Sequence, residues 1–184
     1  MKATEILMEE HRVIERVLNA LETAANRLSA GQVIPMDFFL KAADFIKGFA
    51  DGCHHKKEEG ILFVAMDANG MAQDAEPISI FLEEHEEGRR LTRSMREVAE
   101  RVQRGDTTAL SQVIQNALDY VALLREHIQK EDHMLFPMAD DVIPIEQHQQ
   151  LMADFNRIEH EETGEEIHEK YLRIADELAN IVKN

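Results

Sequence analysis

The sequence predicts an all-α protein: an antiparallel four-helix bundle with up-down-up-down topology and an extra C-terminal helix. Three observations support this fold class. Among 184 residues there are 8 glycines, 4 prolines and no tryptophan, and aromatic residues make up 5%, which argues against a turn-rich β-sandwich. Apolar residues recur every three or four positions over long stretches, the period of an amphipathic helix. With 44% apolar and 30% charged residues, the chain can bury a core and keep a soluble surface.

Apolar residues spaced by three, four or seven predict a first helix over residues 5–28. The segment 29–32, Ser-Ala-Gly-Gln, ends this helix. Pro35 opens the second helix, because proline is favoured in a first helical turn, and apolar residues continue to about Met66. The segment 67–70, Asp-Ala-Asn-Gly, then closes it with residues that are common in turns.

The third helix begins near Pro77 and ends before Gly105. The fourth covers about 106–137, and Pro144 opens a fifth helix that runs to the C-terminus. Gly164 lies in the middle of this fifth helix. A glycine there costs about 1 kcal/mol relative to alanine, so we expect a kink at this position.

Short connections join the first four helices, which favours antiparallel packing of neighbours. We therefore expect residues 1–140 to form the bundle. Residues 141–184 are expected to form a C-terminal helical extension that packs on the outside of the bundle or binds a partner protein. The longest apolar run, residues 61–66, is too short to span a bilayer.

The 36 acidic and 20 basic residues give a net charge of −16. This charge repels phosphate groups, so neither nucleic acid nor an anionic membrane is an expected partner. The N-terminal residues lack the apolar segment of a signal peptide. A single cysteine, Cys53, excludes an intramolecular disulfide framework and fits a reducing compartment. We therefore expect a soluble cytoplasmic protein.

The first two helices resemble the next two. Leu-Met-Glu-Glu-His11 in the first helix matches Phe-Leu-Glu-Glu-His85 in the third, 74 residues later. In the second helix, His54-x-x-x-Glu58 precedes Ile-Leu-Phe, and in the fourth, 73 residues later, His127-x-x-x-Glu131 precedes Met-Leu-Phe-Pro. Two matches at nearly one offset indicate two repeated αα-hairpins. Each hairpin then supplies one histidine from its first helix and a His-x-x-x-Glu pair from its second.

All six side chains of this pattern lie on the apolar faces of their helices, because residues four apart share one face. Burying carboxylates and imidazoles without compensation costs several kcal/mol, and no matching set of inward lysines or arginines is apparent. Two divalent cations can compensate them, each bound by two histidines and bridged by the two glutamates. Such a shell keeps open coordination positions, and its donors favour iron first and manganese second. Structural zinc more often takes thiolates.

The ordered set His11, His54-x-x-x-Glu58, His85 and His127-x-x-x-Glu131, followed by Leu-Phe-Pro, resembles the hemerythrin-like (HHE cation-binding) domain family over about residues 1–140. The resemblance implies a four-helix bundle that holds two iron ions in an oxo- or hydroxo-bridged non-haem centre, with manganese or zinc as alternatives. Such a centre binds O₂ or a related small oxidant. Members of the family carry or sense oxygen, sense iron, or act in nitric oxide, peroxide or iron–sulfur repair chemistry.

The sequence departs from the oxygen-carrying members of that family at two places. Those members have a second histidine one turn after the histidine of the third helix, where this chain has Arg89. Their last helix uses a His-x-x-x-x-Asp spacing, whereas Glu131 stands here at the fourth position and Asp132 at the fifth. The resemblance is therefore to the variety with four histidines and two glutamates. The candidates to complete the iron shell are His55, Tyr120, Tyr171 or water.

The repeat favours His54 over its neighbour His55, because Glu58 and Glu131 both stand five residues before a phenylalanine. His55 is interpreted as a solvated or outer residue, or as an extra ligand. Cys53 is interpreted as a packed small hydrophobic residue. His133 is expected to face away from the metals.

The fifth helix carries an acidic run together with His148, His160 and His168. A solvated, charged helix face is the simplest interpretation of this composition. The alternative is that His168 or Tyr171 folds back as a lid over an open metal position.

Two functions follow from the sequence. The first is a di-iron protein that handles O₂, nitric oxide or peroxide, either as a peroxide- or nitric-oxide-consuming oxidoreductase or as a sensor. The second is an iron- or oxygen-sensing or interaction module, whose metal is structural or regulatory and whose C-terminal helix contacts a protein partner. The sequence assigns no catalytic residue beyond the metal ligands.

Overall fold

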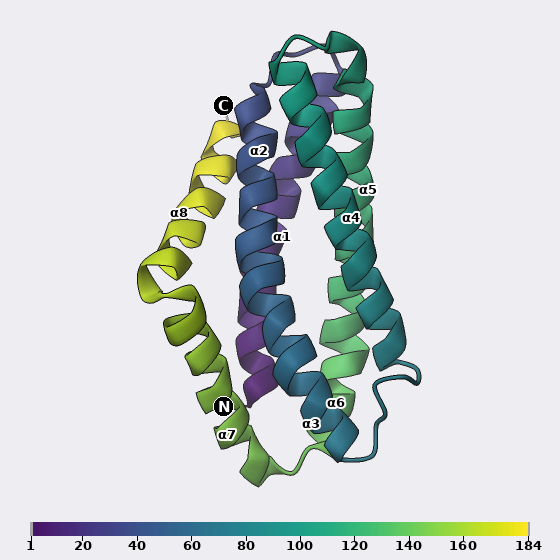
Figure 1. Ribbon diagram of the computed structural model, residues 1–184, viewed down its shortest axis with the longest axis vertical. Helices are drawn as coiled ribbons and strands as arrows, with labels where there is room; N and C mark the ends of the chain where they lie inside the picture. The colour runs from purple at the N-terminus through teal and green to yellow at the C-terminus, as the bar shows by residue number, and fades with distance from the viewer. Residues whose placement is uncertain (1, 184) are drawn as a thin grey trace.

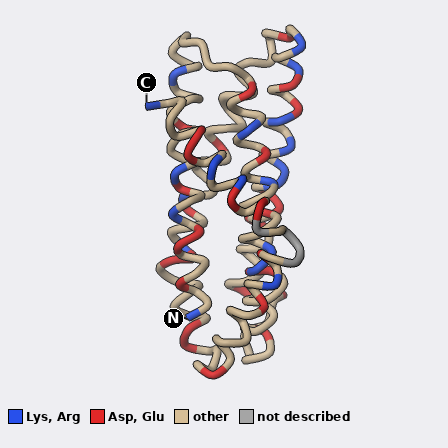
Figure 2. Tube along the Cα trace, turned by 90° about the vertical axis from the view of Figure 1, so that its left-hand side faces the viewer, with Lys and Arg blue, Asp and Glu red and all other residues tan. Residues whose placement is uncertain are grey.

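The computed structural model describes residues 2–183, apart from the side chains of 161–163 and 165, and all regular secondary structure in that range is helical. The all-α prediction is thereby confirmed. Long helical rods lie side by side along the longest axis of the molecule, and successive rods are joined at alternating ends (Figure 1). Basic and acidic positions are interspersed along the rods (Figure 2). None of the described helices combines the length and the apolar character that crossing a bilayer requires.

The second and fourth rods are built from several successive segments. The first rod is α1 (Ala3–Ser29) and the third is α4 (Ile78–Gln103). The second rod consists of α2 (Met36–Phe45), the π-helical segments η1 (Ile46–His55) and η2 (Glu58–Leu62), and α3 (Phe63–Ala68). The fourth rod consists of the 3₁₀ turn η3 (Thr107–Ala109), α5 (Leu110–Lys130), the π-helical segment η4 (Glu131–Leu135) and α6 (Phe136–Val142).

Proline marks helix starts as the sequence predicts, since Pro35 and Pro77 immediately precede α2 and α4. The fourth rod, however, does not end near Pro137 but continues to Val142. The prediction is wrong here because Pro137 stands in the first turn of α6, directly after a π-helical segment. A residue without a backbone N–H is tolerated in a first turn.

The predicted fifth helix is divided into two parts. α7 (Ile145–Arg157) follows Pro144 and continues as the π-helical segment η5 (Ile158–Thr163), and α8 (Glu165–Ile181) comes after it. Gly164 between them has a φ of 86°, a left-handed conformation that glycine adopts without steric cost. The chain changes direction there (Figure 1), so the predicted kink is confirmed. α8 then lies against α1 and α2.

The apolar core consists of two clusters of buried side chains with a polar layer between them. On α1, for example, Leu7 and Ile14 belong to different clusters, and His11 lies between them. The other three rods pass from one cluster to the other at the corresponding point. Each rod therefore brings its predicted ligands to the same level of the molecule.

Tyr171 of α8 packs directly on Gly48 of η1. A Cβ atom built on Gly48 would lie 1.9 Å from the Cζ and Oη atoms of Tyr171. The ring of Tyr171 also meets that of Phe45 edge-on, with centroids 6.4 Å apart. The missing side chain at position 48 is thus what allows the C-terminal helix to dock on the second rod.

Gly48→Ala is expected to destabilise the fold by about 1–3 kcal/mol, the usual effect of forcing extra atoms into a packed interface. Helix propensity acts in the opposite direction, because replacing a mid-helix glycine by alanine contributes about 0.5–1 kcal/mol. Gly60→Ala on the same rod is the matched control, since nothing lies within 4 Å of its added Cβ. Urea unfolding should show opposite signs for the two variants, and Tyr171→Ala should relieve the effect of Gly48→Ala. Equal stability of the two glycine variants would contradict this packing.

Candidate metal centre

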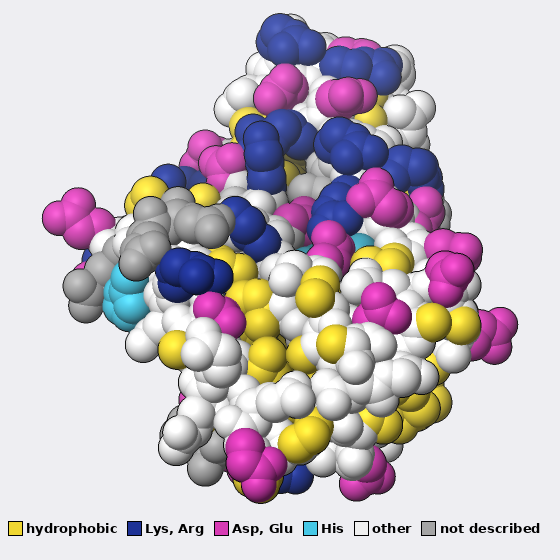
Figure 3. Space-filling model, turned by 60° about the horizontal axis from the view of Figure 1, so that its bottom comes forward, with side chains coloured by type: hydrophobic (Ala, Val, Ile, Leu, Met, Phe, Trp, Pro, Cys, Tyr) yellow, Lys and Arg dark blue, Asp and Glu magenta, His cyan; other side chains and the backbone are white. Residues whose placement is uncertain are grey.

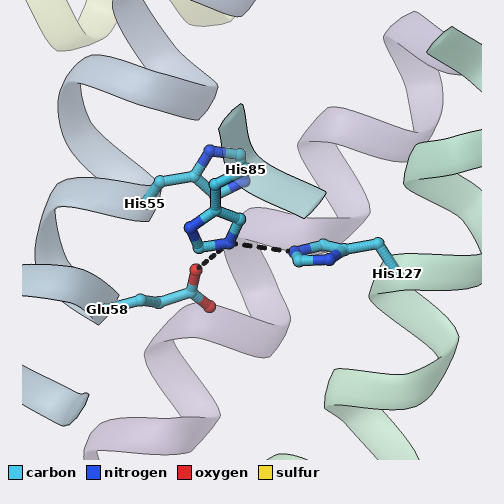
Figure 4. A group of neighbouring side chains, drawn as sticks. All are labelled: His55, Glu58, His85 and His127. Atoms are coloured by element: carbon cyan, nitrogen blue, oxygen red, sulfur yellow. Dashed lines mark hydrogen bonds and ion pairs between the residues drawn. The ribbon is translucent and has the colours of Figure 1, made fainter. Parts of the chain in front are cut away.

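The six side chains predicted as ligands lie together in the polar layer. They come from all four rods, and each residue is at most 1% exposed. Figure 4 shows Glu58, His85 and His127 converging, together with His55. The full predicted set is His11, His54, Glu58, His85, His127 and Glu131.

The donor atoms form two overlapping groups, within each of which the ligand atoms all lie within 4.8 Å of one another. The first group contains His11, His54, Glu58 and Glu131. The second contains His55, Glu58, His85 and His127. Because Glu58 belongs to both groups, its carboxylate is shared between them.

Each central glutamate presents one carboxylate oxygen to each group. Glu58 Oε1 lies 3.3 Å from His54 Nε2, and its Oε2 lies 3.5 Å from His85 Nε2. Glu131 spans the layer in the same way, with its oxygens 3.1 Å and 3.0 Å from Nε2 of the other two predicted histidines. Two carboxylates that both span the layer suit a dinuclear centre, in which the metals are about 3.5–4 Å apart.

Every predicted histidine is held from behind by a carboxylate. Because a carboxylate can only accept a hydrogen bond, the Nδ1–H of each ring donates it. Nε2 then faces the polar layer and is the atom left to bind a metal. The pairs are His54–Glu10 at 2.9 Å, His127–Glu84 at 2.8 Å, His85–Glu59 at 2.7 Å and His11–Asp132 at 2.6 Å.

These outer carboxylates follow the sequence repeat. Glu10 and Glu84 directly precede the histidines of the first and third rods, and each holds the histidine on the other rod of its own hairpin. Glu59 and Asp132 directly follow the central glutamates, and each holds a histidine of the opposite hairpin. This role of the four carboxylates was not predicted from the sequence, although they repeat at the same offsets as the predicted ligands.

A buried lysine lies behind the site and corrects one expectation. Lys57 is 0% exposed, and its Nζ donates to Glu10 and, at 3.0 Å, to Glu159 of η5. Lys130, at the equivalent place in the repeat, donates to Glu84. An inward cation therefore exists, but Lys57 compensates an outer carboxylate, and none of the described lysines or arginines pairs with the two central glutamates.

His55 is buried, with 2% exposure, so its interpretation as a solvated residue is wrong. In an α-helix two adjacent residues point about 100° apart, so a regular helix would not direct His54 and His55 to the same place. Both lie at the end of η1, where the wider π-helical turn separates adjacent side chains less in angle. His55 stacks on His85, with ring centroids 3.9 Å apart, and pairs through Nδ1 with Asp51 at 3.0 Å. This placement agrees with the alternative of an extra ligand.

The central glutamates raise the pKa values of two of the predicted histidine ligands. Burial lowers the pKa of His54, but the carboxylates of Glu58 and Glu10 outweigh it and raise this pKa to about 10. The pKa of His127 is raised to about 9 against the same effect of burial, chiefly by Glu131. Burial and the neighbouring His85 instead lower the pKa of His55 to about 4. At neutral pH the metal-free site therefore holds protons, which a metal must displace.

The central polar atoms fit a bound cation. Among the described residues, both oxygens of each central glutamate, and Nε2 of His11 and His54, make no hydrogen bond of normal geometry, although they lie close to one another. Nε2 of His85 and Nε2 of His127 lie only 3.1 Å apart. Buried acceptors that face one another cost free energy unless a cation or a proton lies between them. Imidazole and carboxylate donors without a thiolate suit iron or manganese better than structural zinc.

Two departures from the oxygen-carrying pattern have clear places in the structure. Arg89 turns away from the polar layer and pairs with Glu59 at 2.6 Å and Glu86 at 2.5 Å. Asp132 pairs with Nδ1 of His11, on the outer side of that ring, whereas Glu131 is fully buried. The glutamate at the fourth position, rather than the aspartate at the fifth, thus faces the layer.

Among the remaining histidines, His133 and His160 are exposed, the former as predicted. Cys53 is buried, with 1% exposure, as predicted for a packed small residue. His148, which lies before the acidic run on the predicted fifth helix, is also buried. The reason is that α7 packs against the start of α1, where the backbone N–H of Ala3 donates to His148 Nδ1 at 3.2 Å.

The side chains considered as a lid or as further ligands lie as follows. Tyr171 packs on Gly48, outside the polar layer. His168 is half-buried beside Phe49 and lies 3.5 Å from Glu159. The described contacts of Tyr171 and His168 are thus with the second rod and with η5. Tyr120 is buried, and its hydroxyl has no hydrogen-bond partner.

The chain matches the hemerythrin HHE cation-binding domain over residues 2–139. Over 182 residues it is 26% identical to an uncharacterized protein of Mycobacterium bovis and to one of Mycobacterium tuberculosis, covering 99% of this chain and 69% of each relative. No solved structure gives a significant match. The matched segment contains the first three rods, the fourth as far as the start of α6, and all six predicted ligands. The chain therefore belongs to the hemerythrin HHE cation-binding domain family.

Proposed function

We propose that the chain is a cytoplasmic, non-haem di-iron protein that binds O₂ or a related small oxidant, nitric oxide or peroxide, between its helices. One observation carries this proposal. Glu58 and Glu131 each direct one carboxylate oxygen to the first group of inward-facing histidines and the other oxygen to the second group. Imidazole and carboxylate donors support iron, with manganese as the next choice.

The donors divide unequally between the two proposed irons. Glu58 and Glu131 would be shared, His11 and His54 would hold one ion, and His85 and His127 the other. His55 adds an imidazole to the second group only, because the repeat-related position is Ile128. The first group thus has fewer protein donors, and an iron held there would keep more coordination positions free. When bound, the iron would offer these free coordination positions to a small ligand and would supply a metal that can change its oxidation state.

The arrangement of partners supports an up-down-up-down bundle of two repeated hairpins in residues 1–140, with residues 141–184 as an extension. Each hairpin supplies a carboxylate to its own histidine and another to the opposite hairpin. This exchange follows an approximate two-fold relation. Such a relation would place the two ions in similar surroundings, apart from His55.

Apolar side chains restrict what can reach the polar layer. The ring of Phe136 stacks on His11 with centroids 5.4 Å apart, and that of Phe81 meets His127 edge-on, also at 5.4 Å. The two apolar clusters cover the layer from both ends. These surroundings favour small ligands and keep bulk water from the histidines and glutamates.

A specific contact supports a second candidate, an iron or oxygen sensor that signals through the C-terminal extension to a protein partner. His54 pairs with Glu10, Glu10 with Lys57, and Lys57 with Glu159 of η5. The metal layer is thus joined to the extension by three successive polar contacts. Loss of metal would change the charge at one end of this chain of contacts.

The test is anaerobic reconstitution with ferrous iron, followed by metal analysis and visible absorption before and after adding peroxide. Two irons per chain and new visible bands are the expected result. Continued loss of peroxide would favour an enzyme, whereas a stable spectral change would favour a sensor. Fewer than one iron per chain, or zinc alone under competition, would overturn the di-iron proposal.

A further inference from the structure

A groove of about 390 Å³ lies between the second rod and α4, outside the polar layer. Its volume falls within the usual range of small-molecule sites, about 300–1,000 Å³. Ala43 and Thr92 contribute short side chains to its lining, and Gly52 contributes backbone only. Its other lining residues are charged: Lys47, Asp51, Arg89, Arg93 and Arg96.

Two of the four cations around the groove lack a partner among the described residues. Arg96 pairs with Asp44, and Arg89 pairs with Glu59 and Glu86. Lys47 and Arg93 are exposed, and the described residues provide neither with a hydrogen bond or an ion pair. Isolated surface cations are ordinary, but here they converge on one hollow of a chain whose net charge is −16.

In Figure 3, Lys and Arg side chains gather over the upper part of the visible face, with Asp and Glu side chains among them. Of the three arginines in the lining, Arg93 keeps its planar guanidinium group free of the described carboxylates. This geometry matches a carboxylate through two parallel hydrogen bonds. The aliphatic stems of these residues and the short side chains beside them leave room for an apolar body.

The groove also borders the candidate metal centre. Asp51 lies in its lining and accepts a hydrogen bond from Nδ1 of His55 at 3.0 Å. His55 is the imidazole that belongs to the second donor group. A molecule in the groove would therefore lie one carboxylate and one imidazole away from the proposed irons.

We propose that this groove binds a small organic carboxylate, with its anionic group between Lys47 and Arg93 and its apolar body against the aliphatic stems of the groove's long side chains. The site is separate from the iron positions and does not need iron in order to bind. Lys47 and Arg93 attract the anionic group of the ligand, and the groove accommodates its apolar body. An inorganic oxyanion has the charge but no apolar body.

Calorimetric titration of the full chain with benzoate tests this proposal, with benzyl alcohol and inorganic phosphate as comparison probes. Benzoate should bind at least tenfold more tightly than either, because the alcohol lacks the charge and phosphate lacks the apolar body. Arg93→Gln combined with Lys47→Gln should weaken benzoate binding at least tenfold. Arg90→Gln is the control, since Arg90 is an exposed arginine of α4 outside the groove lining.

Metal-free and iron-loaded protein should bind benzoate alike, which separates this result from the di-iron proposal. Equal binding of phosphate and benzoate would overturn the organic carboxylate in favour of a simple anion site. Binding that survives the double substitution, or that Arg90→Gln reduces equally, would overturn the location. Failure to bind any probe would overturn the site itself.

Discussion

Glu58→Gln is expected to reduce the iron bound after reconstitution from two ions per chain to fewer than one. Glutamine keeps nearly the same shape but removes the negative charge and one of the two oxygen donors. In the structure those oxygens lie 3.3 Å from His54 and 3.5 Å from His85, so one substitution affects both donor groups. Metal analysis and visible absorption measure the effect, and circular dichroism checks that the helices remain.

Glu59→Gln is the matched comparison for that substitution, one position further along the rod. Glu59 pairs with Nδ1 of His85 from behind and does not face the polar layer. Such outer partners typically change metal affinity by about 10–100-fold when removed, so this variant should still bind two irons at saturating concentration. If Glu58→Gln retained two irons, or if both variants lost metal equally, Glu58 would not be a shared ligand.

The repeat in the sequence explains why the centre could be predicted so far. Helical spacing places His54 and Glu58 on one face, and the same pattern 73 residues later gives His127 and Glu131. Those positions depend only on local geometry and on apolar neighbours, which a sequence displays directly. The structure brings all of them into one buried layer.

The parts that the sequence did not reveal depend on nonlocal or irregular structure. His55 becomes buried because η1 is π-helical, and no residue pattern in the segment predicts that change of turn. Lys57 is buried because η5 closes over it with Glu159, a contact between residues far apart in the chain. The break at Gly164, by contrast, depends on a glycine in a helical segment and could be predicted.

Removal of the metal is expected to destabilise the fold. When free metal stands at about 1,000 times its dissociation constant, each site contributes about 4 kcal/mol. For a chain of this size 1 kcal/mol corresponds to about 2–4 °C in Tm, so the metal-free protein should melt lower by about 10 °C or more. The physical reason is that Glu58 and Glu131 are 0% exposed and then depend on protonated imidazoles for compensation. Equal melting temperatures of the two forms would contradict the prediction.

The difference in melting temperature between the metal-bound and the metal-free protein should widen as pH rises from 6.5 to about 9. The pKa of His54 is raised from 6.5 to about 10 and that of His127 to about 9 in the metal-free fold. A raised pKa contributes stability that is fully present below the unfolded value and is lost as pH rises through the folded value. In the metal-bound form these protons are already displaced, so that loss does not occur. Thermal melts of both forms at the two ends of this range measure the change.

Metal-free Glu58→Gln should show a weaker pH dependence of its melting temperature, because Glu58 is the leading charge that raises the pKa of His54. A constant difference would show that the imidazole protons do not replace the metal in the folded chain.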